Sequence, residues 1–146
     1  MKTKHIKRAL ALLLSLLMLL GCFVFVSCSE PTPTDALWEN ALYDEDKTFG
    51  DGAKTVAVQV IAGEKSVTFT VKTDKETLAD ALLEHGLVEG EDGAYGLYVK
   101  KVNGILADYD VDQTYWSLSK NGETLMTGVS GETVTDGAHY EFTQTK

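Results

Sequence analysis

Residues 55–73 read TVAVQVIAGEKSVTFTVKT, and this stretch decides the fold. Apolar and polar residues alternate on both sides of a short Gly-containing segment, as they do in two strands that each bury one face. The apolar positions of the two runs are Val56, Val58, Val60, Val67, Phe69 and Val71. The pattern predicts an antiparallel hairpin that turns at residues 62–65 and has one apolar face.

After the hairpin, the hydrophobic period changes to that of a helix. Residues 73–86 read TDKETLADALLEHG and place Leu78, Ala81 and Leu82 on one stripe. Thr73 or Asp74 is expected to cap the first turn, and Gly86 to end the helix after about 11 residues. Because this helix is amphipathic, it should lie on the apolar face of the hairpin.

Further strands follow the helix. A loop is expected at GEDGA (90–94). In YGLYVKKVNG (95–104), apolar and polar residues alternate, but the alternation is interrupted at Lys100–Lys101. A β-bulge at this point would keep the apolar residues before and after it on the same face. TYWSLSKNGET (114–124) and HYEFTQT (139–145) each read as a strand, and two Asn-Gly pairs read as turns. The order favours an α+β fold over residues 54–146, with one helix on one face of a β-grasp-like mixed sheet.

The first 27 residues have the composition of an export signal. MKTKHIKR is basic, and residues 9–27 form an uncharged run of 19 residues. That length allows either a cleaved signal or a retained anchor. The two cysteines, Cys22 and Cys28, lie at the end of this run, each directly after a small residue.

The residues before each cysteine resemble a bacterial lipobox. The resemblance implies a lipoprotein signal peptide over 1–27 and acylation of Cys28 with chains such as palmitate, with Cys22 as the alternative. The product would be exported and lipid-anchored to the outer face of the bacterial cell membrane.

Residues 28–53 are acidic and contain Pro31 and Pro33, and we interpret them as a flexible linker. Within it, Trp38, Leu42 and Tyr43 either form a short turn or dock on the domain. The whole chain has a net charge of −9, and residues 28–146, with nine basic and 22 acidic residues, have −13. Such a surface repels nucleic acid, so no nucleic-acid partner is expected.

Catalytic chemistry is not predicted. Beyond residue 28 the histidines are His85 and His139, and neither has a serine or cysteine motif nearby. A nucleophilic triad, a phosphate loop and HExxH are absent from the sequence. We therefore expect a protein that is not an enzyme, with two structural histidines.

A DxDxD run at Asp108, Asp110 and Asp112 resembles the opening of a calcium loop. However, its sixth and twelfth positions are Gln113 and Ser119 instead of glycine and glutamate. We interpret the run as a solvated acidic turn and expect no metal site.

Five aromatic residues fall within 22 positions: Tyr95, Tyr98, Tyr109, Tyr115 and Trp116. Trp116 is expected in the core, with its indole N–H hydrogen-bonded to a partner. Tyr115 lies on the opposite face of the strand and could be either in the core or on the surface. Tyr95 and Tyr98 bracket Gly96 at the mouth of a loop. They are either ordinary strand aromatics or flat rings that let a planar ligand approach the backbone.

The order TLADALLEHG, YGLYVKKVNGI, TYWSLSKNGE and DGAHYEFT resembles the C-terminal β-domain of transcobalamin and intrinsic factor. It is equally similar to bacterial transcobalamin-like domains of surface lipoproteins. The resemblance implies a β-grasp-like fold in which one sheet edge meets a soluble ligand. It also implies that the ligand-binding residues are Tyr95, Gly96, Leu97 and Tyr98.

The sequence departs from those carriers in two respects. Tyrosine stands where they tend to have tryptophan, which keeps a flat ring but reduces its area. The helical domain that closes over cobalamin in the carriers has no counterpart in these 146 residues. Binding on an open face would therefore be weak or would need another protein to close the site.

We therefore expect a cell-surface lipoprotein that captures cobalamin or a related corrinoid, with no covalent cofactor. Its expected partners are this small molecule and a membrane transporter or second cell-surface protein. The alternative is a non-catalytic protein-interaction or spacer module whose sheet edge pairs with another protein.

Overall fold

The hairpin predicted from residues 55–73 forms the centre of a six-stranded sheet. It consists of β2 (Lys54–Ala62) and β3 (Lys65–Thr73), and Gly63 takes the left-handed conformation that the tight turn between them requires. Directly opposed side chains meet in the antiparallel pairs Val56–Val71, Val58–Phe69 and Val60–Val67, and all six are buried. The predicted hairpin and its apolar face are confirmed.

The computed structural model describes residues 32–146, and these residues belong to one compact unit. The signal peptide predicted over 1–27 and the acylation predicted at Cys28 or Cys22 lie outside the described residues. Among residues 32–146, no helix is both long enough and apolar enough to cross a membrane.

The six-stranded sheet has the order β1-β3-β2-β9-β7-β8. Its remaining strands are β1 (Lys47–Gly50), β7 (Tyr115–Lys120), β8 (Glu123–Thr124) and β9 (His139–Thr145). β9 runs parallel to β2 and antiparallel to β7, and β1 runs parallel to β3. The sheet is therefore mixed, with the first hairpin strand beside the last strand, and the predicted α+β class is confirmed.

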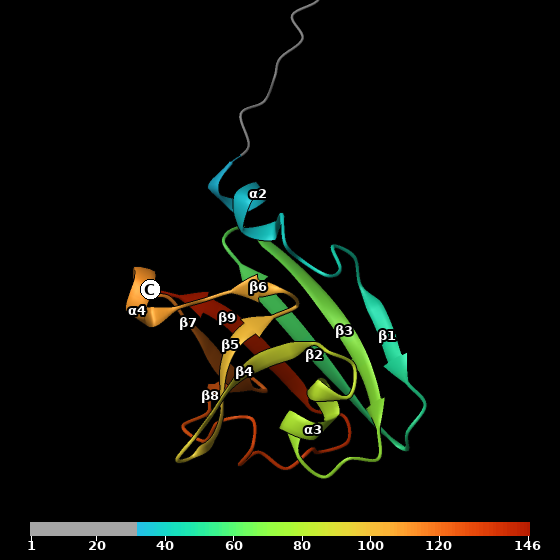
Figure 1. Ribbon diagram of the computed structural model, residues 1–146. Coiled ribbons are helices and arrows are strands. Elements are labelled where there is room, and N and C mark those ends of the chain that lie inside the picture. Colours follow the sequence, from blue (N-terminus) through green and yellow to red (C-terminus); the bar gives the residue numbers. More distant parts are fainter. Residues whose placement is uncertain (1–31) are drawn as a thin grey trace, which may run out of the picture. The chain divides into compact units, whose positions relative to one another are not determined.

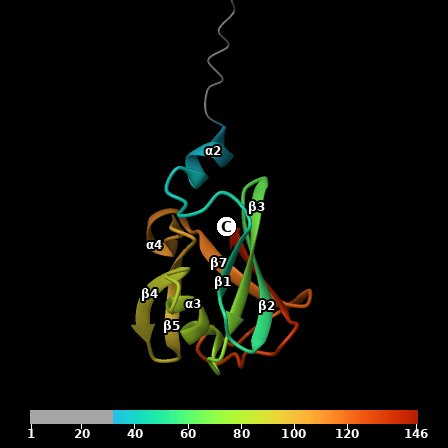
Figure 2. The ribbon, with the colours of Figure 1, turned by 90° about the vertical axis from the view of Figure 1, so that its right-hand side faces the viewer.

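A second sheet and helix α3 (Leu78–Leu83) cover one face of the six-stranded sheet (Figure 1 and Figure 2). This sheet has the order β4 (Val88–Gly93), β5 (Gly96–Val102) and β6 (Ile105–Leu106). The loop expected at residues 90–94 is instead mostly strand β4, because its backbone pairs with β5. A register shift between Glu89 and Gly90 leaves Lys100 as the extra residue on β5, so the predicted bulge is confirmed.

Helix α3 is shorter than the pattern predicts and begins later. Its cap is Thr77, whose hydroxyl accepts a hydrogen bond from the Asp80 N–H at 3.2 Å. The expected start near Asp74 is wrong because that side chain accepts from the Ala53 N–H at 2.9 Å instead. The predicted stripe of Leu78, Ala81 and Leu82 is buried, so the helix packs as expected.

Residues 32–53 pack on the domain, so the linker predicted over 28–53 is wrong for its described part. Helix α2 (Pro33–Trp38) buries Trp38, whose Nε1 donates to the Ala62 carbonyl at 2.9 Å. The Tyr43 ring meets the rings of Phe49 and Phe69 edge to face, with centroids 5.2 and 5.9 Å apart. These aromatic contacts, together with the pairing of β1 to β3, order a segment whose acidic composition suggested a tether.

Replacing Trp38 tests whether this segment contributes to stability. Trp38→Ala should lower the free energy of unfolding by about 3 kcal/mol, because it removes a buried indole and its hydrogen bond to the Ala62 carbonyl. Leu42→Ala is the control, since Leu42 is 53% exposed. Chemical denaturation of residues 29–146 measures both, and equal small losses would show that the segment does not dock.

Candidate functional site

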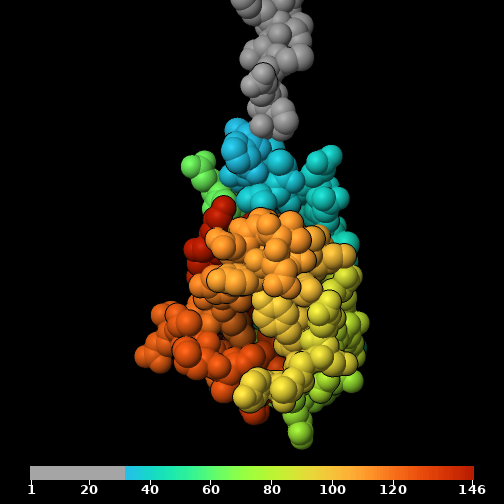
Figure 3. All heavy atoms as spheres, turned by 60° about the vertical axis from the view of Figure 1, so that its left-hand side comes forward, coloured from blue at the N-terminus to red at the C-terminus, as the bar shows by residue number. Residues whose placement is uncertain are grey.

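A pocket of about 330 Å³ opens between the start of β5, strand β7 and the loop that follows β8. Its wall consists of Leu97, Tyr98, Val99, Tyr109, Tyr115, Trp116, Leu118, Gly128, Val129 and Phe142. Figure 3 shows this face of the molecule, hollowed between the β4–β5 hairpin and β7 and bordered by helix α4 (Tyr109–Asp112). We call it the aromatic pocket; its volume lies at the small end of the range for ligand sites.

The four residues predicted to bind a ligand lie at one side of this pocket. Leu97 and Tyr98 line it, and the Tyr98 side chain is 49% exposed. Tyr95 is not in the wall; it stands on the turn between β4 and β5 and is 98% exposed. Gly96 begins β5 next to both rings, so the stretch forms one edge of a pocket whose other walls come from elsewhere in the chain.

The structure gives Gly96 a packing role. Its φ of +100° disfavours any residue with a side chain, and an added Cβ would lie 2.5 Å from Cβ of Ser130. The Ser130 hydroxyl accepts a hydrogen bond from the Leu97 N–H at 3.0 Å. The glycine therefore lets the loop after β8 clamp the start of β5 and so shapes the pocket.

The remaining wall comes from residues that sequence reasoning did not join into one site. Tyr109 on α4 and Tyr115 on β7 line the pocket with rings that are 56% and 40% exposed. Trp116 is buried as predicted, but its Nε1 has no hydrogen-bond partner, so the expected pairing is wrong. The clustering of aromatic residues in the sequence was the available signal, whereas nothing in the sequence pointed to Val129.

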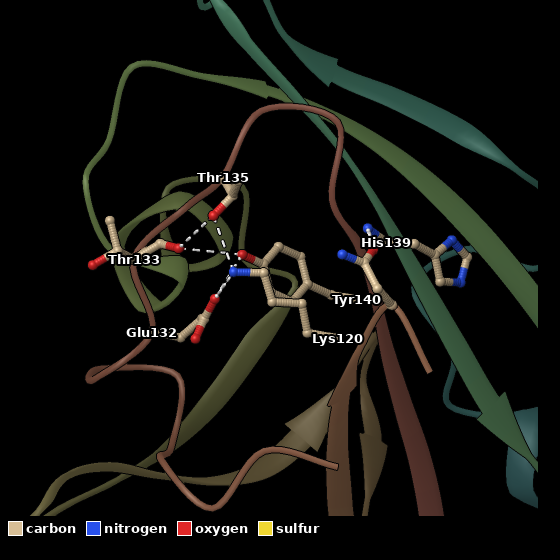
Figure 4. A network of polar contacts seen from close by, with 7 residues as sticks. Lys120, Glu132, Thr133, Thr135, His139 and Tyr140 are labelled. Atoms are coloured by element: carbon tan, nitrogen blue, oxygen red, sulfur yellow. Dashed lines mark hydrogen bonds and ion pairs between the residues drawn. The ribbon is translucent and has the colours of Figure 1, made fainter. Parts of the chain in front are cut away.

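A polar network holds the loop that forms this wall (Figure 4). The Lys120 ammonium lies 2.6 Å from Glu132 Oε1 and 3.0 Å from the Thr135 hydroxyl. The Tyr140 hydroxyl donates to the same Glu132 oxygen at 3.0 Å. Because the Glu132 side chain is only 11% exposed, its charge needs both donors.

The same contacts change the protonation equilibria of the network. The hydrogen bond to Glu132 raises the pKa of Lys120. Burial, and then the neighbouring Glu132 carboxylate, raise the pKa of Tyr140. Helix α3 adds to the restraint, because the Leu78 N–H donates to the Glu132 carbonyl and the Ala79 N–H to the Val129 carbonyl.

Both histidines lie outside the wall of the aromatic pocket. His139 Nε2 is 3.1 Å from Gln59 Oε1 on the neighbouring strand. His85 follows α3, and its ring centroid is 5.4 Å from that of Phe49. The two side chains therefore make separate contacts with the fold.

The DxDxD run caps a short helix. The Asp108 carboxylate accepts from the Asp110 N–H at 3.1 Å, and Asp112 accepts from the Thr114 N–H at 3.0 Å. Across the part of the chain that the structure describes, no three His, Cys, Asp or Glu side chains gather as a metal site. The acidic side chains thus act locally, at the border of the aromatic pocket.

Parts of this chain are similar to known proteins. Residues 75–146 match the family described as Domain of unknown function (DUF4430). A crystal structure of a "putative metal binding protein" from Ruminococcus gnavus ATCC 29149 has a TM-score of 0.60 and 35% identity, covering 64% of this chain and 97% of that one. No curated protein matches the sequence.

The structure is also similar to haptocorrin, solved in complex with Cbi, with a TM-score of 0.52 and 21% identity. That similarity covers 67% of this chain and 26% of haptocorrin, and at this identity it shows the fold alone. The β-grasp-like domain predicted from the sequence thus has a counterpart in one part of a much longer protein.

Gly96→Ala tests the packing of the pocket wall. It should destabilise the protein by about 2 kcal/mol, because the new Cβ meets Ser130 and the positive φ becomes strained. Gly93→Ala is the matched control, since its nearest atom would be 3.4 Å away and its φ is not positive. Thermal unfolding compares the two, and similar effects would contradict the assigned role of Gly96.

The network around Glu132 predicts a loss of stability in alkali. Folded-state pKa values raised above 10.5 for Lys120 and 10.0 for Tyr140 stabilise the fold fully below those values. That contribution disappears as the pH rises through the raised values. Tyr140→Phe should cost about 1 kcal/mol at pH 7 and flatten the decline of the unfolding temperature above about pH 10. Parallel declines in the two proteins would show that Tyr140 does not contribute to it.

Proposed function

We propose that this chain, whose sequence resembles transcobalamin-like domains, captures a small flat ligand such as a corrinoid in the aromatic pocket. One observation carries the proposal. In the stretch Tyr95–Tyr98, which resembles the ligand-contacting part of the cobalamin carriers, Leu97 and Tyr98 form a wall of an open aromatic pocket. Haptocorrin, one part of which has a similar fold, was solved in complex with Cbi, and this makes cobinamide the first ligand to test.

The pocket favours stacking of a flat molecule over chemistry on it. Half-exposed rings of Tyr98, Tyr109 and Tyr115 offer apolar faces with polar tips, and no charged side chain lies in the wall. Charged residues that a general acid or base would need lie at the border instead. The proposed role is therefore binding without catalysis.

The size of the ligand determines which residues of the protein it contacts. A volume of about 330 Å³ accepts one edge of a corrinoid, so the rest of such a ligand would extend beyond the pocket. Tyr95, exposed on the adjacent turn, is placed to stack on that outer part. We assign Leu97 and Tyr98 to the inner contact, Tyr95 to the outer one, and Gly96 to holding the stretch in place.

The same proposal includes a place in the cell. The lipobox-like sequence before Cys28, or before Cys22, supports a lipid anchor on the outer face of a bacterial membrane. From there the domain would hand its ligand to a transporter or another surface protein. Exposed Val111 and Met126, on elements that border the pocket, suit contact with such a protein.

Titration of residues 29–146 with cobinamide, cobalamin and haem tests the proposal. We expect a shift in corrinoid absorbance with a Kd of about 10 µM or tighter for at least one corrinoid. Tyr98→Ala should weaken binding about ten-fold by removing a stacking ring, whereas Tyr98→Phe should retain it. Tyr95→Ala should weaken corrinoid binding by a smaller factor.

Leu83→Ala is the control for these variants, because Leu83 is exposed on α3 and outside the pocket wall. Absence of any spectral change at about 100 µM of each compound would remove the corrinoid proposal. Binding that survives Tyr98→Ala unchanged would move the site elsewhere.

A further inference from the structure

Rings from three separate elements surround the aromatic pocket. Tyr98 comes from β5, Tyr109 from α4, and Tyr115 with Trp116 from β7. The faces of tyrosine and tryptophan rings attract a cation that comes within about 6 Å of the ring centre. A pocket that combines such rings with a wall free of charged side chains provides this attraction without a competing ammonium group inside it.

The border of the pocket is acidic. On β4, Glu91 is the cross-strand partner of Tyr98, so its side chain lies on the same face of this sheet as the Tyr98 ring. Asp108, Asp110 and Asp112 cap and form α4, the helix that carries Tyr109. Carboxylates therefore lie near two of the rings that line the pocket.

Two lysines lie near these acids and do not cancel them. The Lys100 ammonium is 3.0 Å from Glu91 Oε1, and Asp108 and Asp110 also act on it electrostatically. Lys146 acts on Asp112, and hydrogen bonds from Thr114 keep the pKa of Asp112 below its usual value. Four carboxylates, those of Glu91, Asp108, Asp110 and Asp112, thus face two ammonium groups, and this excess of acids favours the approach of cations over that of anions.

We infer that the aromatic pocket selects a positively charged group, so that its preferred ligand is a cation or inserts a cationic part. This inference rests on the proposed function and names the chemical class of ligand for the same site. A neutral flat molecule would be held by stacking alone and would not respond to the acidic border. A flat anion such as haem, with two carboxylates, should bind less tightly than a cationic ligand of similar shape.

Two small molecules of the same shape but different charge test the inference directly. Choline and its neutral isostere 3,3-dimethylbutan-1-ol are titrated into residues 29–146, which include the compact domain that the structure describes. Calorimetry and the fluorescence of Trp116, which lies in the pocket wall, report binding. Choline should bind about ten-fold more tightly than the isostere. Equal affinities, or no binding of choline up to about 50 mM, would overturn the inference.

Charge variants locate the effect at the border. The double variant Glu91→Gln, Asp110→Asn should lower the affinity for choline about five-fold at low salt and leave that of the isostere unchanged. The difference should shrink at about 0.5 M salt, where charges are screened. The control Glu39→Gln, Glu64→Gln removes two charges from exposed positions of α2's end and the β2–β3 turn, and should change both affinities less than about two-fold.

The proposed function and the inference about ligand charge can be refuted independently of each other. Cation preference without any corrinoid binding would keep the inference and replace the proposed ligand. Corrinoid binding with equal affinities for choline and its isostere would keep the proposed function and remove the charge selection. If the double variant Glu91→Gln, Asp110→Asn behaves like its control, the charge selection is also refuted.

Discussion

The structure depends on the in-register contact of apolar side chains across three central strands. Val58 lies between Phe69 on β3 and Tyr140 on β9, so that one face of the sheet becomes a continuous apolar surface. Burial of such side chains is the main favourable term in folding, and a register slip of one residue would turn the whole set to solvent. Leu78 and Leu82 of α3 then pack on a surface that is already specified.

The aromatic pocket arises where this rigid sheet ends. Strands β7 and β9 of that sheet supply part of its wall, and the rest belongs to elements that the sheet does not order by itself, namely β5, α4 and the loop after β8. Ser130 ties that loop to β5, and Glu132 ties it to β7 and β9 through Lys120 and Tyr140. A buried carboxylate with two donors thus holds the site in place, because leaving the buried Glu132 carboxylate unpaired would cost free energy.

Apolar rings and surface charge have different roles at this site. In the proposed site, the tyrosine faces would supply contact area that every flat ligand can use, whereas the acids at the border would discriminate by charge. The net negative charge of the chain, taken by itself, indicates only that the protein is kept in solution by charge repulsion. Part of this acidity lies beside the pocket, because Glu91 on β4 pairs with Tyr98 and three aspartates cap and form the helix that carries Tyr109.

The sequence alone determined the local elements whose pattern is strong. Alternation gave the β2–β3 hairpin and its buried face, Asn103-Gly104 and Asn121-Gly122 marked turns, and the break at Lys100 marked a bulge, because each of these depends on residues close in sequence. Tertiary structure decided the docking of Trp38, the late start of α3 at Thr77, and the convergence of the aromatic rings. These features depend on partners far along the chain, such as Ala62 for the indole N–H of Trp38, and no local period encodes such contacts.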